Sequence, residues 1–169
     1  MEVDEIPVGG KSNNDSGDPF GSEFPEQSKP QEDVSNKPLE DRIVSKKWNE
    51  RASAYEELSE NLKKVSSSKD PIFYDHKESF DKYLKDNNPG ALEKAVEWFI
   101  EYAKRAPDTV VRDLQATAID NLVSKSISHL KPSLQDKGKE AIWCIIENTE
   151  DFEGVSEAVA KPIKSNNVK

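Results

Sequence analysis

The sequence predicts an all-α fold built from paired helices, and three observations lead to this prediction. After residue 37, apolar residues recur at spacings of three and four, which is the period of an amphipathic helix. No segment alternates apolar and polar residues over the length of a strand, so we predict no β-structure. Clusters rich in Pro, Gly, Asn and Asp separate the periodic segments and mark the turns between helices.

The first helical segments follow Pro38. Glu40 and Asp41 come soon after this proline, and carboxylates in a first turn face the positive end of the helix dipole. A longer helix begins near residue 48 and carries a single apolar stripe, which ends at a run of turn-forming residues over 66–71. The stripe comprises Trp48, Ala52, Tyr55, Leu58, Leu62 and Val65.

The remaining helices are expected to form pairs joined by tight turns. The turns fall near residues 47, 87, 134 and 166, a spacing centred on about 40 residues, which is the period of HEAT and armadillo repeats. In such repeats each helix packs against its partner and against the next pair. We therefore predict a HEAT-repeat α-solenoid with a loop at residues 129–137. Its further helices are expected over residues 72–84, 91–103, 114–127, 139–147 and 152–163.

Residues 1–36 differ from the rest of the chain in composition. They contain nine acids and two lysines, a net charge of −7, whereas the whole chain carries −9. Few apolar residues occur there and none is periodic, so we predict a disordered acidic tail and a folded region over residues 37–169.

Charge and cysteine content exclude several functional classes. A nucleic-acid-binding domain needs a basic surface, and the net charge of −9 argues against one and against binding to a membrane surface. The single cysteine, Cys144, permits no intrachain disulfide and favours a reducing compartment. With no apolar run of signal-peptide or membrane-spanning length, the expected location is the cytoplasm or nucleus.

Candidate catalytic groups are sparse. His76 and His129 are far apart and have no neighbouring Cys or His, so we expect surface histidines and no metal site. Residues 9–12 end like a phosphate-binding loop, but Glu5 occupies the position of its first glycine. We expect no cofactor and no enzymatic activity.

The three tryptophans carry the most information about binding. Trp98 and Trp143 lie within apolar helical patterns, and both are expected to be core residues. Trp48 begins a helix among charged residues. It fits the core, because it starts an apolar stripe, and fits equally well an exposed interface anchor, a role that tryptophan often fills.

The segment around Trp48 resembles the opening of a TOG domain, from the microtubule-polymerase family typified by the tumour-overexpressed-gene protein. The resemblance covers residues 37–169. Later segments resemble the second, third and fourth intra-repeat loops of the family at residues 84–88, 131–139 and 164–169. The residues that carry the opening match are Pro38, Leu39, Glu40, Asp41, Arg42, Ile43, Lys46, Lys47, Trp48, Arg51 and the run Ala54, Tyr55, Glu56, Glu57, Leu58.

The resemblance implies a flat paddle of HEAT repeats that binds αβ-tubulin along the edge made by these loops. It implies a cytoplasmic, microtubule-associated protein of the cytoskeleton, linked to microtubule dynamics and the mitotic spindle, with spindle or centrosomal proteins as further partners. Asn49 and Ser45 depart from the family pattern, which has a basic residue and often a ring residue there. The tubulin-binding residues carried over by position are Trp48, Lys46, Arg51, Asn87, Asn88, Lys137, Lys139 and Lys169.

The family paddle has roughly six repeats, whereas residues 37–169 accommodate about three and a half helix pairs, so the domain is expected to be incomplete at its C-terminus. Two alternatives stay open. In the first, the chain is a HEAT-repeat adaptor for a non-tubulin protein, with an exposed apolar face around Val155, Val159 and Ile163. In the second, it is an inert truncated fragment.

Overall fold

The structure, a computed structural model, describes the backbone of residues 37–166 and the side chains up to Lys161. The predicted acidic tail, residues 1–36, and the predicted site residue Lys169 lie outside the described residues. Within them every regular element is helical, which confirms the all-α prediction. The elements are α1 (Leu39–Ile43), α2 (Trp48–Lys64), α3 (Ile72–Asp75), α4 (Phe80–Tyr83), α5 (Pro89–Arg105), α6 (Asp108–Asn121), the π-helix η2 (Leu122–Ile127), α7 (Pro132–Thr149) and α8 (Phe152–Asn166).

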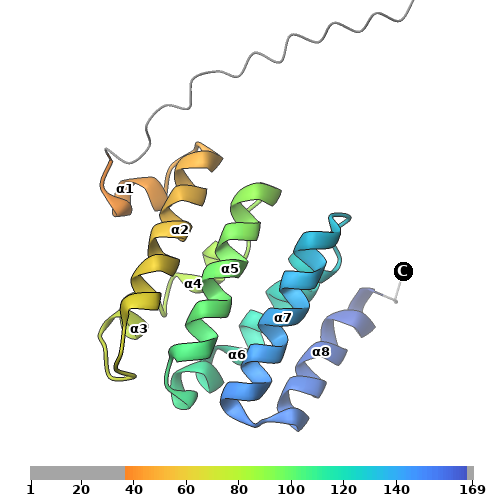
Figure 1. The fold of residues 1–169 in the computed structure, drawn as a ribbon. Coiled ribbons are helices and arrows are strands. Elements are labelled where there is room, and N and C mark those ends of the chain that lie inside the picture. The colour runs from red at the N-terminus through yellow and green to blue at the C-terminus, as the bar shows by residue number, and fades with distance from the viewer. Residues whose placement is uncertain (1–36, 167–169) are drawn as a thin grey trace, which may run out of the picture. The chain divides into compact units, whose positions relative to one another are not determined.

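The helices form two layers, as a HEAT-repeat solenoid requires (Figure 1). Helices α2, α5 and α7 lie side by side in one layer, and each contacts the next. Helices α4, α6 and α8 follow one another in the second layer, where α6 contacts both of its neighbours. The described residues therefore contain three helix pairs, α2 with α4, α5 with α6 and α7 with α8, preceded by the short α1; about three and a half pairs were predicted.

The core lies between the layers and is rich in aromatic residues. Trp98 on α5 is 1% exposed, and its ring meets those of Tyr83 and Tyr102 at centroid distances of 5.4 Å. Complete burial of a large apolar side chain contributes roughly 1.5–3 kcal/mol. The expectation that Trp98 is a core residue is thus confirmed.

The predicted helix over residues 72–84 is wrong, because α3 and α4 are two separate turns. The carbonyl oxygen of Phe73 accepts a hydrogen bond from the buried Tyr102 hydroxyl. The amide of Lys77, which would bond that carbonyl in a continuous helix, instead donates to Tyr74 O at 3.2 Å. A tertiary hydrogen bond therefore replaces a helical one at this point.

The predicted loop at residues 129–137 is also wrong. Helix α7 begins at Pro132, a residue whose missing N–H suits the first helical position, and the connection spans only residues 128–131. Gly138 allows α7 to approach η2 closely, because an added Cβ would lie 2.9 Å from Ser126 Cβ.

Trp143 is not a core residue, contrary to prediction: it is 53% exposed on α7. The core-facing residues Ala141 and Ile145 each lie two positions away, which is about 200° around a helix of 3.6 residues per turn. The exposed face expected at Val155 is absent too, because Val155 is 2% exposed and Val159 packs against the core. The side chain of Ile163 lies outside the described residues.

Candidate functional site

Three connections meet one edge of the solenoid. Helices α2, α5 and α7 all begin at this edge, at the top of Figure 1, and the segments that precede them are residues 44–47, 84–88 and 128–131. We call this the loop edge. At the opposite edge lie α3 and the start of α8.

Trp48 is the first residue of α2 and lies on the loop edge. The indole is 50% exposed. Its buried part packs against the first turn of α5, where an added Cβ at Gly90 would lie only 3.1 Å from Trp48 Cζ3. A glycine at position 90 therefore lets the ring rest on α5 while its other part faces solvent. Trp48 is thus neither a core residue nor a fully exposed one: its ring is half exposed and is supported by α5.

Arg51 joins two connections of the loop edge. Its Nε and Nη2 atoms donate to the Asp86 carboxylate at 2.6 and 2.8 Å, and Nη1 donates to Ser45 O at 2.8 Å. A weaker bond runs from Nη1 to Lys46 O at 3.2 Å. The guanidinium is therefore engaged inside the protein, where it holds residues 45–46 against residue 86. The two-pronged geometry is the strong form of an arginine–carboxylate pair.

Asp86 is the centre of this network, and its side chain is 2% exposed. It also accepts hydrogen bonds from the Tyr55 hydroxyl at 3.3 Å and from the Asn88 amide at 2.9 Å. Burial by itself raises the pKa of Asp86, but the bonds from Arg51 and from the Asn88 amide outweigh it and hold the pKa below its ordinary value. Asp86 is thus an ionised structural acceptor.

The two asparagines of the second connection have different positions. Asn88 caps α5, because its Oδ1 accepts from the amides of Gly90 at 2.9 Å and Ala91 at 3.2 Å. Asn87 is exposed. Its backbone is held on one side by Asp86 and on the other by the Asn88 cap, so its side chain projects from an ordered turn.

A shallow depression of about 440 Å³ lies between the first two connections. Arg51, Tyr55 and Asp86 line it, and Lys46, Lys82 and Asn87 are exposed lining residues. Lys85 also lines it and pairs with Asp81 at 2.7 Å. The lining thus combines a neutralised interior ion pair with lysines that give the rim a positive charge.

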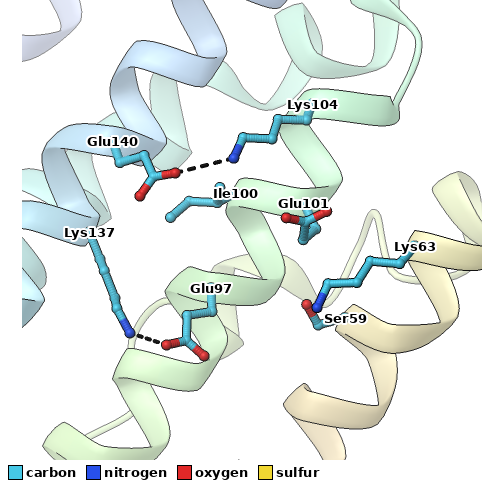
Figure 2. Close-up of a pocket in the computed structure, with 8 residues that line it drawn as sticks. All are labelled: Ser59, Lys63, Glu97, Ile100, Glu101, Lys104, Lys137 and Glu140. Carbon is cyan, nitrogen blue, oxygen red and sulfur yellow. Dashed lines mark hydrogen bonds and ion pairs between the residues drawn. The ribbon is translucent and has the colours of Figure 1, made fainter.

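The lysines predicted for the third connection lie elsewhere. Lys137 and Lys139 are in α7, and Lys137 is ion-paired with Glu97 and, at 3.2 Å, with Glu93 of α5. Figure 2 shows Lys137 reaching from α7 to Glu97 across the groove between the two helices. Lys139 is exposed and pairs with Asp136 at 3.1 Å. Lys137 therefore connects α7 to α5 through ion pairs.

Comparison with known proteins identifies the family. The sequence model of the XMAP215/Dis1/CLASP TOG domain matches residues 33–169. The chain belongs to this TOG-domain family.

The relatives of this TOG domain are much longer proteins. It is 30% identical over 138 residues to Centrosomal protein 224 of Dictyostelium discoideum, which covers 82% of this chain and 7% of that protein. It is 27% identical over 120 residues to spindle pole body component alp14 of Schizosaccharomyces pombe, which covers 69% of this chain and 15% of that protein.

Solved structures support the fold. One, from work on tubulin recruitment and assembly by microtubule polymerases with TOG-domain arrays, matches with a TM-score of 0.65 and 24% identity over 75% of this chain and 26% of that chain. An engineered protein matches with a TM-score of 0.58 and 15% identity over 78% of this chain and 51% of that chain. The TOG fold is therefore shown by both sequence and structure.

The structure also places two groups on the TOG loop edge that sequence reasoning missed. The role of Asp86 is not visible in local sequence, because its partner Arg51 lies 35 residues earlier. Leu130 is 96% exposed in the third connection. The available signal was its position outside every helical stripe, followed by Lys131 and Pro132.

Among the described residues, no group of three or more His, Cys, Asp or Glu side chains is arranged to hold a metal ion. None of their helices is both long and apolar enough to cross a membrane.

Proposed function

We propose that this TOG domain binds αβ-tubulin along the loop edge, with Trp48 as the apolar anchor. The observation that carries the proposal is the half-exposed Trp48 ring supported on Gly90 at the first of three aligned connections. A tryptophan held in place loses little conformational freedom on binding and supplies a large area for desolvation. A solved TOG-array structure concerned with tubulin recruitment shares the fold.

The remaining predicted site residues take different parts in this proposal. Lys46 and Asn87 are exposed beside the depression and are proposed as direct polar contacts. Arg51 and Asn88 are proposed as positioning residues, because their polar atoms already bond within the edge. Lys139 is a proposed outlying contact that affects the association rate more than affinity.

Lys137 has little left for a partner, because two glutamates of α5 engage its ammonium group. Lys169 stays a predicted tubulin contact, because it lies outside the residues that the structure describes.

We propose further that the chain acts as a binding module, without catalysis, in microtubule dynamics. Its relatives are described as a centrosomal protein and a spindle pole body component. These descriptions support a location at cytoplasmic microtubules, the spindle or its poles, with centrosomal or spindle proteins as further partners.

The test is a titration of αβ-tubulin with the full chain carrying Trp48→Ala, with Trp143→Ala as the matched control. Both tryptophans are about half exposed, at 50% and 53%, but Trp143 lies along α7 away from the loop edge. Loss of a central aromatic anchor costs about 2 kcal/mol or more, a weakening of roughly 30-fold, and the control is expected to bind as the wild type does.

Equal binding by wild type and Trp48→Ala contradicts the proposal, as does a wild-type chain that fails to bind tubulin at low salt. Tubulin binding that is lost with Trp143→Ala and retained with Trp48→Ala contradicts a site on the loop edge. No tubulin binding by the wild type or either variant leaves the second candidate, an adaptor for a non-tubulin protein partner. The exposed Trp143 is the observation that favours this candidate, because exposed tryptophans are frequent interface anchors.

A further inference from the structure

We propose that Leu130 is a second apolar contact for αβ-tubulin on the loop edge, and this inference rests on the proposed function. Leu130 lies in the connection between η2 and α7, in which the family resemblance indicated only basic contacts. The proposal therefore assigns the third connection an apolar role in place of an electrostatic one.

Exposure sets Leu130 apart. At 96% it exceeds the other exposed large apolar side chains among the described residues. A single exposed leucine is common on protein surfaces and proves nothing by itself. What distinguishes Leu130 is how the segment around it is held. The other exposed large apolar side chains are Val44 at 62%, Trp48 at 50%, Tyr74 at 53%, Trp143 at 53% and Phe152 at 65%.

The segment is ordered on both sides of Leu130. The Ser128 amide and hydroxyl donate to Val123 O at 3.1 and 2.7 Å. His129 O accepts from Gln135 Nε2 at 2.6 Å, and the Lys131 amide donates to His129 Nδ1 at 3.0 Å. These bonds fix the backbone that presents Leu130, so the side chain is held in solvent and does not fold back onto the core.

Lys131 strengthens this interpretation. Its ammonium group is paired with Glu93 of α5, which links the connection to the neighbouring helix. The positive charge next to Leu130 therefore already has a carboxylate partner within the protein. What this connection offers a partner is an apolar side chain on a rigid support, and rigidity lowers the entropy lost on binding.

The spacing along the edge indicates the kind of partner. Trp48 starts α2 and Leu130 precedes α7, with α5 packed between them. Packed helices lie 8–10 Å apart, so the two apolar groups are separated by roughly 16–20 Å. A small ligand does not span this distance, whereas a protein surface does. Because Trp48 marks the same edge, we assign both contacts to αβ-tubulin.

The experiment compares Leu130→Ala with Phe152→Ala in the full chain, titrated with αβ-tubulin at low and high salt. Phe152 is 65% exposed at the start of α8, on the opposite edge (Figure 1). We expect Leu130→Ala to weaken binding about tenfold, as for removal of most of a leucine side chain from a buried contact. The factor should stay the same at both salt concentrations, since it reflects no charge.

Unchanged melting temperatures for both variants are expected and exclude a folding effect. If Trp48→Ala weakens binding while Leu130→Ala binds like the wild type, the inference is overturned and the proposed function stands. If Phe152→Ala weakens binding as much as Leu130→Ala, the effect is not specific to the loop edge and the inference is again overturned. If Trp48→Ala has no effect, the proposed function itself fails, and Leu130 loses its assignment to this partner.

Discussion

Replacement of Arg51 by alanine tests whether the loop edge is built on a buried ion pair. The change removes two hydrogen bonds to Asp86 and two to the backbone of residues 45–46. Asp86, with a side chain only 2% exposed, is left with the Tyr55 hydroxyl and the Asn88 amide. An uncompensated carboxylate therefore remains in a poorly solvated site.

The magnitude follows from the burial of the pair. Removal of one partner of a fully buried pair costs 3–5 kcal/mol, but Arg51 is 19% exposed, so water partly compensates and we expect about 3 kcal/mol. The entropy of unfolding is about 2.1 cal/mol/K per residue, or roughly 0.27 kcal/mol/K for the region described. The melting temperature should thus fall by about 10 °C.

Thermal unfolding followed by circular dichroism measures this effect. Arg105→Ala is the matched control, because Arg105 is 37% exposed and, among the residues that the structure describes, pairs with Glu101 one turn away. Such a surface pair contributes under about 1 kcal/mol, so the control should melt within a few degrees of the wild type. An Arg51→Ala variant that melts as the control does would refute the assignment of the pair as structural.

The pH dependence gives a second check on the same pair. Because the folded-state pKa of Asp86 lies below its value in the unfolded chain, the stability that it contributes is present above about pH 4 and is lost as the pH falls through the folded pKa. Asp86→Asn should therefore be less stable than the wild type at pH 7, and the difference should narrow below pH 4. A difference that is constant with pH would contradict an ionised Asp86.

Two further predictions concern the packing of α7. The pKa of Glu93 is lowered to about 2, because the bonds from Lys131 and Lys137 outweigh its burial. The stability that Glu93 contributes is thus present above about pH 4.3 and is lost towards pH 2. Acid unfolding of Glu93→Gln, followed by fluorescence, should therefore be less steep in this pH range than that of the wild type. Gly138→Val should lower the free energy of unfolding in urea by about 2 kcal/mol through overpacking against η2, and an unchanged denaturation midpoint would show that α7 has room to shift.

Much of the fold was predictable because its signals are local. The stripe of α2 and the turn before α5 both follow from residues within one or two helical turns of each other, and both were placed correctly. The division of residues 72–84 into α3 and α4 was not predictable in this way. It depends on the Tyr102 hydroxyl, 29 residues from the Phe73 carbonyl that it bonds.

The candidate site shows the same division. Sequence placed Trp48 and Asn87 on connections that the structure brings to one edge. The predicted loop at residues 129–137 includes Lys137, whereas in the structure Pro132 begins α7 and Lys137 lies within that helix. Local sequence does not show which lysines already have ion-pair partners, since the Lys137–Glu97 pair spans 40 residues.

By itself, the sequence determined that this chain is a helical TOG domain, because helical periodicity and the family residues around Trp48 are local properties of the chain. Only the tertiary structure decided which polar groups of the loop edge support it and which face solvent. Arg51 is held by Asp86, Trp143 is turned outward, and Leu130 is presented on a fixed connection. The reason is that burial and charge pairing depend on residues 35 and more positions apart, which only the packed helices bring together.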